Sequence, residues 1–416
     1  MKTAFKRKLT CLAFTLAATT VMGSADAYAV PVYDITFLRG PGNSNNVSGT
    51  AINDERQVTG EIRRDGRFRA FTTPPITNVF DADANARDPL SPFTNLFYNN
   101  LTDLGTFGGQ YSRGKDINNR GQVAGWARDS SGADRAFISD PTTNALTQLD
   151  SLGGALDFAN GINESGTVAG MSATGPFNSV GRATTHATIW DAGGITDIGT
   201  LGGTSSSAND INDRGQVTGT SNLDNVPGGP QRAFVWDAVN GMTDIGALSG
   251  GPSFHGSSRG SAINNPGQVV GTSDLISYDS RGRRRDLSHA FLWDEINGMV
   301  DLGTLFGPGI RGNSYGVDIN DYGQVIGYSD SLRGGLTAFL WENGVMYDLN
   351  ELININQPVS GFVGGSIFMG INNAGDIIVG NKLLVRQQPN GVPEPTPIAL
   401  LGLGLLGFGV MRKRRG

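Results

Sequence analysis

The chain offers few residues that could carry out a reaction. It has one cysteine, Cys11, and three histidines, His186, His255 and His289. His186 and His289 each precede the Ala of a recurring segment, HATIW or HAFLW, and other copies of that segment have Arg or Thr in the same place. Such positions belong to a repeat rather than to a catalytic centre. His255 follows a Gly-rich loop without an evident partner, and no GxSxG motif of serine hydrolases is present.

Carboxylates outside the repeats form a second set of candidates. A secreted carbohydrate-active enzyme, a hydrolase or a lyase, would need two such groups, and propellers host both activities through variation of their loops. Two insertions, 74–100 and 273–288, contain non-repeat aspartates, but no spacing favours one pair. The candidates are Asp81, Asp83 and Asp88 in the first insertion and Asp274, Asp279 and Asp286 in the second.

A calcium loop is a third possibility, because Asp210, Asn212, Asp213 and Gly215 resemble the start of one. An EF-hand loop also requires ligands at alternate positions and a closing Glu at its twelfth residue. Here a Gln-Val strand follows instead. A turn stabilised by Asn and Asp side chains explains the pattern better. We therefore predict no dedicated metal site and no cofactor.

The same segment, DINDRGQVTG at 210–219, recurs with drift in seven copies. Each copy has an Asn followed, in six cases, by a Gly three residues later, and Gly can adopt the positive φ that a tight turn requires. In the first copy Arg56 replaces the Gly. The predicted turn residues are Asn53, Asn118 with Gly121, Asn163 with Gly166, Asn212 with Gly215, Asn264 with Gly267, Asn320 with Gly323, and Asn372 with Gly375.

The best copy predicts four short strands, here named a to d. Strands a (206–212) and b (216–220) flank the turn, strand c covers 232–237, and strand d covers 242–246. In strand c, Phe234 and Trp236 share one face by the two-residue alternation. The copies lie 45 to 65 residues apart. Four strands at this period are typical of a β-propeller blade, whereas a β-solenoid coil is shorter.

The two ends of the repeat region predict how the ring closes. Residues 32–38 read as a strand d with no a, b or c before it, and the last copy has a (366–372), b (376–380) and c (383–386) with no d after it. The first strand can therefore complete the last blade and leave no open seam. We predict an all-β fold over residues 30–386, a seven-bladed β-propeller of four-stranded blades. Asp and Asn side chains of each blade could line its central channel and bind cations weakly.

The strand c motif, His or Arg followed by Ala-Phe-x-Trp, and the loop of DLGTLGG type (Asp197–Gly203) resemble the HAF-repeat family of extracellular bacterial proteins. The resemblance covers roughly residues 32–386. The strand order is also similar to that of WD-repeat propellers. Two copies depart from the pattern: copy one has Arg56 at the turn, and copy seven lacks the aromatic pair.

Charge and cysteine content exclude several partners and sites. Outside the segments 1–29 and 387–416 the chain has 24 basic and 36 acidic residues, a net charge of −12. Nucleic acid is therefore not an expected partner. One basic run, Arg281 and 283–285, is best explained as an exposed loop, with contact to an anionic ligand as the alternative. Cys11 lies in a segment that we expect to be removed, so the mature protein would have no thiol.

The first 29 residues read as a secretory signal peptide, with a basic start, an apolar run from Leu9 to Met22, and Ala-x-Ala sites that end at Ala27 and Ala29. We expect cleavage after Ala29 and export by the Sec machinery. The apolar run is short and interrupted by Thr, which argues against a retained transmembrane helix.

The C-terminal segment, residues 387–416, is distinct from the repeats. A Pro-rich linker (387–397) precedes 14 apolar residues, 398–411, and a basic end, Arg412, Lys413, Arg414 and Arg415. A hydrophobic helix of that length spans about 21 Å, less than a bilayer core of about 30 Å. With Val392, Pro393, Glu394 and Pro395, this order resembles the PEP-CTERM sorting signal (393–416). The resemblance implies recognition by an exosortase, a membrane enzyme; a permanent membrane anchor is the alternative.

These observations predict an exported, non-enzymatic protein of the cell envelope or exopolysaccharide matrix of a Gram-negative-type bacterium. The hydrophobic tail would hold it at the inner membrane before processing. It would bind an extracellular polysaccharide or an envelope protein, or act structurally. The alternative is the secreted carbohydrate-active enzyme considered above.

Overall fold

The computed structural model describes residues 30–40, 45–76, 97–98, 100–177, 183–224, 229–251, 254–278, 283–307, 312–332, 334–353 and 368–387. All of them except Val30 lie in one compact unit, Pro31–Gln388. The predicted signal peptide and its cleavage residues, nearly all of the Pro-rich linker, and the sorting segment lie outside the described residues. Within the described part, no helix is long and apolar enough to cross a membrane.

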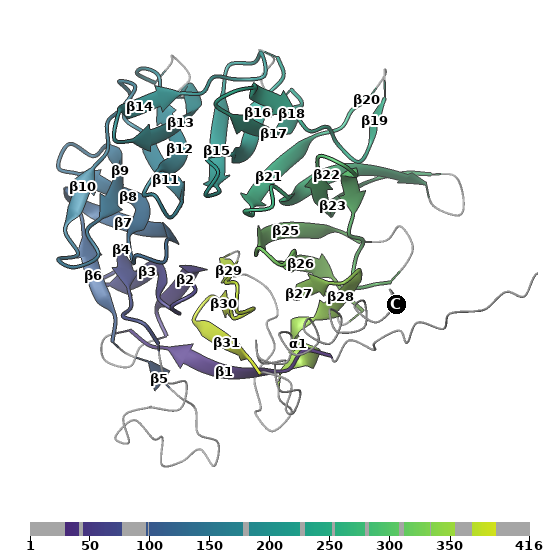
Figure 1. Cartoon of the computed structure of the whole chain (residues 1–416), viewed down its shortest axis with the longest axis horizontal. Helices are drawn as coiled ribbons and strands as arrows, with labels where there is room; N and C mark the ends of the chain where they lie inside the picture. The colour runs from purple at the N-terminus through teal and green to yellow at the C-terminus, as the bar shows by residue number, and fades with distance from the viewer. Residues whose placement is uncertain are drawn as a thin grey trace, which may run out of the picture. The chain divides into compact units, whose positions relative to one another are not determined.

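Antiparallel sheets form a ring of seven blades (Figure 1), so the predicted seven-bladed propeller is confirmed. Each blade follows the order of strands a, b, c and d. Blades 1 to 3 are β2 (Val47–Ile52), β3 (Val58–Arg64), β4 (Arg67–Thr72) and β6 (Thr102–Gly105); β7 (Gly108–Ile117), β8 (Val123–Asp129), β9 (Asp134–Ser139) and β10 (Leu146–Gln148); and β11 (Asp157–Ile162), β12 (Val168–Ala173), β13 (Thr185–Asp191) and β14 (Gly194–Asp197). Blades 4 to 6 are β15 (Ser206–Ile211), β16 (Val217–Asn222), β17 (Gln231–Asp237) and β18 (Gly241–Asp244); β21 (Ser258–Ile263), β22 (Val269–Tyr278), β23 (Arg284–Asp294) and β24 (Gly298–Asp301); and β25 (Ser314–Ile319), β26 (Val325–Asp330), β27 (Leu336–Glu342) and β28 (Val345–Asp348).

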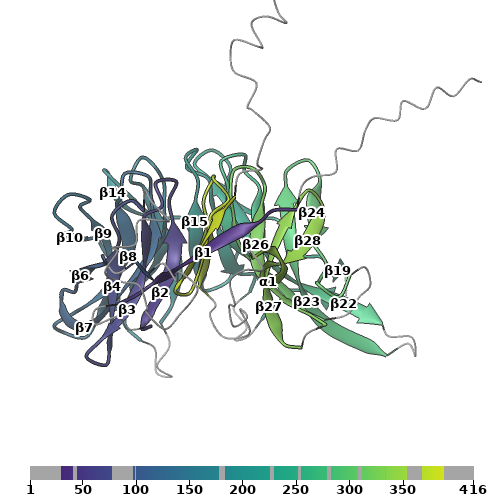
Figure 2. The ribbon, with the colours of Figure 1, turned by 90° about the horizontal axis from the view of Figure 1, so that it is seen from below.

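Blade 7 combines the two ends of the repeat region. It contains β29 (Met369–Ile371), β30 (Ile377–Val379) and β31 (Lys382–Arg386), and β1 (Tyr33–Leu38) pairs antiparallel with β31. Figures 1 and 2 both show these segments, distant in sequence, side by side. The predicted closure by the first strand is therefore confirmed.

Three small elements were not predicted. β5 (Phe97–Tyr98) adds a fifth strand to blade 7, parallel to β1. A short hairpin, β19 (Gly250–Gly251) with β20 (Phe254–His255), interrupts the loop between blades 4 and 5. One turn of helix, α1 (Leu349–Leu352), follows β28, and the Asp348 side chain caps its first turn. All three lie in loops or at a sheet edge, where the repeat pattern gives no guidance.

The turn between strands a and b is the same hydrogen-bonded unit in each blade. In blade 4 the Asn212 side-chain oxygen accepts the backbone N–H groups of Arg214 and Gln216, at 3.1 and 2.9 Å. Gly215 closes the turn with φ of 75°. The Asn212 Nδ2 donates to the Gln216 side chain and, at 2.9 Å, to the backbone carbonyl of Asn264 in the next blade.

That last bond recurs around the whole ring. Each turn Asn donates its side-chain N–H to the carbonyl oxygen of the corresponding Asn one blade further, and the seventh donates back to the first. The donors and acceptors run in the order Asn53, Asn118, Asn163, Asn212, Asn264, Asn320, Asn372 and again Asn53, with distances of 2.9 to 3.2 Å. We call this closed circle the asparagine ring.

A second circle lies one residue further along each turn. The backbone N–H of each residue donates to the side-chain oxygen of its equivalent in the next blade, at 2.8 or 2.9 Å. The order is Asp54, Asn119, Glu164, Asp213, Asn265, Asp321, Asn373 and again Asp54. In the two rings, polar groups of each turn are hydrogen-bonded to the turn of the next blade. These bonds fix the spacing between the innermost strands of neighbouring blades.

The repeated strand c motif also has a structural meaning. The backbone N–H of its Ala donates to a serine that begins strand a of the next blade, and that serine donates to a Gly carbonyl in the loop after strand d. Ser112, Ser206, Ser258 and Ser314 make both bonds. The Phe that directly follows this Ala in strand c is fully buried in five blades. These residues are Phe71, Phe137, Phe234, Phe291 and Phe339. Among the described residues the apolar core consists of seven clusters, each between two neighbouring blades.

Arg56, the departure of copy one from the repeat, lies at the seam between blades 7 and 1, where it meets a second irregular residue. In most blades the Gln at the end of the turn lies beside the turn Gly of the following blade, as Gln122 does beside Gly166. At the seam Asp376 replaces the Gln and Arg56 replaces the Gly. Arg56 adopts φ of 58° and its Nε lies 2.6 Å from the Asp376 carboxylate, whose side chain is 1% exposed. The ion pair stabilises a backbone conformation that a non-Gly residue adopts at a cost of about 1 kcal/mol.

Replacing either partner with the repeat residue tests this seam pair. Arg56→Gly leaves the buried Asp376 carboxylate without its cation, and Asp376→Gln leaves Arg56 strained without compensation. Each single variant is expected to lose about 1–3 kcal/mol of unfolding free energy. The double variant restores the repeat sequence and is expected to recover at least about 1 kcal/mol of the summed loss. Denaturant unfolding of all four proteins gives the coupling energy. Additive losses would show that the two residues are not coupled.

Candidate binding site in the central channel

A β-bulge in strand a determines which side chains face the channel. In blades 1 to 6 the pairing of strands a and b shifts by one residue just before the turn, between Ala208 and Asp210 in blade 4. A bulge redirects side chains and bends the strand. As a result Asn209 and Asp210, two consecutive residues, both line the channel cavity.

The glycine that ends the repeated phrase allows this bulge. Gly219 pairs with Phe234, and a Cβ on Gly219 would collide with the carbonyl oxygen of Ser207 on the bulged strand. Gly60, Gly170, Gly271 and Gly327 are in the same situation in their own blades. A Gly inside a strand is a known sign of a bulge or of close backbone approach. The sequence interpretation expected Asp and Asn side chains of the blades in the channel, and Asp116, Asn160, Asn209, Asp210 and Asp318 do line it. It missed the bulge, which this Gly could have revealed.

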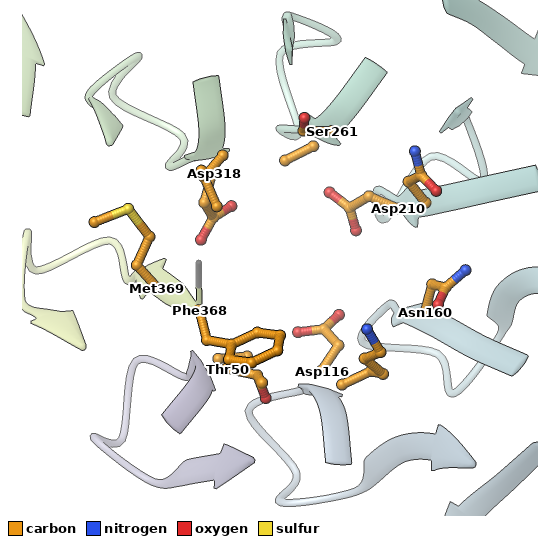
Figure 3. Close-up of a pocket in the computed structure, with 13 residues that line it drawn as sticks. Thr50, Asp116, Asn160, Asp210, Ser261, Asp318, Phe368 and Met369 are labelled. Carbon is orange, nitrogen blue, oxygen red and sulfur yellow. The ribbon is translucent and has the colours of Figure 1, made fainter. Parts of the chain in front are cut away.

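The cavity has a volume of about 250 Å³ and two kinds of wall (Figure 3). Blades 1 to 5 supply the polar wall, with Thr50, Lys115, Asn160, Asn209 and Ser261. Blades 6 and 7 supply the apolar wall, with Val317, Phe368 and Met369. Three carboxylates, Asp116, Asp210 and Asp318, point toward the central space.

The three aspartates occupy alternate blades. Each accepts its own following backbone N–H and one from the next blade; for Asp210 these are Ile211 at 2.7 Å and Ile263 at 2.8 Å. Asp116 and Asp318 make the same two bonds, to Ile117 and Ile162 and to Ile319 and Ile371. The blade that follows each Asp has a small residue in its place: Gly161, Ala262 and Gly370. A Cβ on Gly161 would approach the Asp210 carboxylate to 2.8 Å, so the alternation leaves room for the carboxylates.

These carboxylates titrate unusually. Enclosure in the channel wall, away from bulk water, raises the pKa of Asp116 to about 6 and that of Asp318 to about 7. The pKa of Asp210 is raised well above its usual value by the same desolvation and by the charge of Asp116. Desolvation also lowers the pKa of Lys115, to about 8. Protonated and ionised carboxyl groups therefore coexist in the channel near neutral pH.

A second cavity of about 180 Å³ lies at the mouth formed by the turns and is lined by the two hydrogen-bonded rings. All seven turn Asn residues border it, but their side chains are engaged in the asparagine ring. In the described part of the chain, no group of three or more His, Cys, Asp or Glu is arranged to hold a metal ion. The mouth is therefore a structural feature, and the bulge residues deeper in the channel form the candidate site.

The structure distributes the other candidates over the periphery. His186 and His289 bond through Nδ1 to Asp197 and Asp301 in the neighbouring strand of their own blades, at 2.7 and 2.9 Å. Neither of these two histidines lines a channel cavity. His255 belongs to β20, in the hairpin between blades 4 and 5.

Of the candidate aspartates in the two insertions, Asp274 and Asp286 are described, and neither lines the channel cavity. Asp274 accepts the backbone N–H of Ser257, and Asp286 pairs with Arg284 at 2.8 Å in the extended β22–β23 hairpin (Figure 2). Arg283, Arg284 and Arg285 are exposed at the end of that hairpin. Asp81, Asp83, Asp88, Asp279 and Arg281 lie outside the described residues.

The raised pKa values predict how stability depends on pH. A carboxyl group whose pKa is higher in the folded chain binds more protons there than in the unfolded chain, so stability falls as pH rises from about 4 through about 7. Asp318→Asn removes one such group and is expected to flatten this decline by an amount on the order of 1–3 kcal/mol. The decline in stability is measured as the difference between the unfolding midpoints at pH 4.5 and pH 8. Glu295→Gln, in the exposed β23–β24 turn, is the control. An equal decline in Asp318→Asn and wild type would refute the assignment.

Comparison with known proteins places the chain in a family. The PEP-CTERM protein-sorting motif matches residues 391–415, which confirms the sorting signal recognised in the sequence. The β-propeller domain of the Trilobed protease from Pyrococcus furiosus is similar over 76% of this chain and 83% of that one, with 11% identity and a TM-score of 0.48. TolB from Acinetobacter baumannii is similar over 69% and 61%, with 10% identity and a TM-score of 0.40. No curated protein matches significantly.

Likenesses this distant transfer no activity. The family model described as a protein of unknown function, DUF3466, matches residues 6–207 and again 158–308. The HAF-repeat resemblance remains an interpretation of the strand c motif. Because the two matches together span residues 6–308, more than half of the chain, this protein belongs to the DUF3466 family.

Proposed function

We propose that this protein is a non-enzymatic propeller of the cell envelope or exopolysaccharide matrix of a Gram-negative-type bacterium, and that it binds its ligand in the central channel. The sorting motif at 391–415 is the observation that supports this location, because PEP-CTERM implies export and recognition by an exosortase-type system. Before processing, the hydrophobic segment 398–411 would hold the chain at the inner membrane. Export through the Sec machinery follows from the predicted signal peptide.

The channel cavity supports the binding half of the proposal. Ligand sites are typically concave, with apolar walls and a few convergent polar groups. The cavity combines such walls with three carboxylates and a lysine, all on a scaffold fixed by the two rings. An extracellular polysaccharide is the ligand that fits both the proposed location and this lining, and an envelope protein is the other candidate partner.

One observation favours a carbohydrate-active enzyme as the second candidate. A hydrolase or lyase needs a carboxyl group that stays protonated near neutral pH, and Asp116 and Asp318 have raised pKa values. Each of these carboxylates, however, already accepts two backbone N–H groups that join neighbouring blades. We therefore favour a structural and binding role for them.

Substitution within the sorting motif tests the proposed location. Replacing Glu394 and Pro395 together with Ala removes the residues that define the motif, so the chain is expected to retain its tail and accumulate unprocessed in the membrane fraction. Electrophoretic size and cell fractionation measure this. Thr396→Ala, next to the motif, serves as the control. Processing and location equal to wild type in the double variant would contradict exosortase-type sorting.

A polysaccharide panel tests the activity. The purified full chain is expected to bind at least one bacterial exopolysaccharide in a pull-down or titration and to leave its chain length unchanged. Size-exclusion chromatography and a reducing-end assay detect cleavage. Turnover of any polysaccharide, abolished by Asp116→Asn or Asp318→Asn, would replace the binding role with the enzymatic one. Absence of both binding and turnover would refute the polysaccharide role.

A further inference from the structure

The polar wall of the channel presents more hydrogen-bond acceptors than donors. Thr50 and Ser261 donate their hydroxyl hydrogens to the carbonyl oxygens of Gly114 and Gly316 in the following blades, both at 2.9 Å. Asn160 and Asn209 commit one amide hydrogen each in the same way, to Ala208 at 2.8 Å and to Gly260 at 2.6 Å. The oxygens of these side chains can accept further bonds, although that of Asn209 already accepts from Ser207 at 3.4 Å, and each amide keeps one N–H to donate. The three carboxylates add further acceptor sites.

Lys115 is the exception on this wall. It occupies the position of Thr50 and Asn160 in its own blade, but among the described residues it makes no hydrogen bond or ion pair with another side chain or carbonyl. Lys115 is half-buried, and desolvation together with the charge of Arg113 lowers the pKa of its ammonium group against the opposing charge of Glu61. An ammonium group has three hydrogens to donate, so on the wall of this cavity it favours a ligand that supplies an oxygen acceptor.

The apolar wall has a flat ring at its centre. Phe368 lies in the cavity beside Thr50 and Asp116 (Figure 3). The guanidinium of Arg113 lies 4.9 Å from the ring centroid, and Arg113 is itself held by Glu61. The ring is thus held in place from one side by a cation–π contact, while Val317 and Met369 extend the apolar surface around it.

A ligand for this cavity must offer many hydrogen-bond donors, at least one acceptor oxygen, and an apolar face. A sugar ring meets all three requirements: its hydroxyls both donate and accept, and its C–H face packs against an aromatic ring. A divalent cation could bind the oxygens, but it supplies neither an acceptor for Lys115 nor an apolar face. In the part of the chain that the structure describes, the carboxylates are also not arranged to hold one. A primary amine supplies donors but leaves Lys115 facing a like charge.

Size limits the ligand further. Pockets for drug-sized ligands have volumes of about 300–1,000 Å³, and this cavity has about 250 Å³. We infer that the channel of this propeller is a binding site for a single sugar unit, such as the terminal residue of a glycan chain, with Phe368 against its C–H face, the oxygens of Asn160, Asn209 and the aspartates accepting from its hydroxyls, and Lys115 donating to one of its oxygens. This inference rests on the proposed binding of polysaccharide, whose ligand it specifies.

Titration calorimetry of the purified full chain tests the inference. The probes are free glucose, galactose, mannose, glucosamine and glucuronic acid, with calcium chloride and cyclohexylamine for the rival chemistries. At least one monosaccharide is expected to bind with a dissociation constant of about 0.1–10 mM, which corresponds to a small ligand with few contacts. Saturable binding by calcium or the amine, with no sugar bound up to about 50 mM, would overturn the assignment.

Matched variants locate the binding. Phe368→Leu keeps an apolar side chain but loses the flat ring, and Lys115→Met keeps the length but loses the charge; each is expected to weaken sugar binding about tenfold, as loss of about 1.4 kcal/mol requires. Ala51→Leu adds volume inside the cavity without removing a hydrogen bond and is expected to abolish binding. Glu295→Gln, on an exposed turn, is expected to bind as wild type does. Thermal unfolding of every variant shows that the ring is intact.

The outcomes separate this inference from the proposed function. Unchanged sugar affinity in folded Phe368→Leu and Ala51→Leu would place the sugar outside the channel and overturn the inference. Polysaccharide binding that survives in Ala51→Leu, while no free monosaccharide binds wild type, would also overturn it but leave the matrix role standing. Saturable monosaccharide binding that is lost in Ala51→Leu would support the channel site even if no polysaccharide of the panel bound.

Discussion

The asparagine ring is the interaction on which the rest of this fold depends. Each of its seven bonds joins one blade to the next, and the bond from Asn372 to the carbonyl of Asn53 joins the two ends of the repeat region. A blade that shifted along the channel axis would break a bond on each side, and each lost bond would leave a buried amide unsatisfied at about 1–3 kcal/mol. The requirement is the same in each blade, which is why the turn is repeated so closely. The same requirement engages the polar atoms of the turn in hydrogen bonds between blades, so the turn itself is unsuited to chemistry.

The bulge before the turn relaxes that requirement for two residues in each of blades 1 to 6. Their backbone still belongs to strand a, but their side chains face the channel and need only fit one another. The sequence reflects this freedom: the position occupied by Lys115 in blade 2 is Ser261 in blade 5 and Val317 in blade 6. Variation at a fixed place in a repeat is therefore informative here, because it separates residues that build the ring from residues that define its lining.

The fold could be predicted from the sequence because it follows from counting. The chain has seven turns at the period of a propeller blade. It also has a single strand d before the first repeat and lacks one after the last, so the first strand can complete the seventh blade and close the ring. The channel residues could not be found in the same way. A regular strand with alternating side chains would place Asn209 and Asp210 on opposite faces, and only the bulge brings both to the channel. Gly219 marks the bulge, but Gly also occurs in strands at tight bends and beside ligands, so its presence alone did not identify one. Of the seam pair, only Arg56 was recognised as irregular from the sequence, and its connection to Asp376 required the closed ring.

Closure also determines the chemical character of the channel. A ring of this kind is built by donation from each blade to the next: the turn Asn donates to a carbonyl, and Thr50, Asn160, Asn209 and Ser261 do the same deeper inside. Many donors are thereby engaged by the neighbouring blade, and acceptor oxygens outnumber the free N–H groups that remain toward the channel. Carboxylates add to that excess, and their raised pKa values show the cost of removing them from bulk water, to which the charge of Asp116 adds for Asp210 and Asp318. An acceptor-lined channel is thus a consequence of how the propeller closes. The cation of Lys115 and the aromatic ring of Phe368 are not products of closure, and both lie in the cavity, so they are the features that point to a ligand.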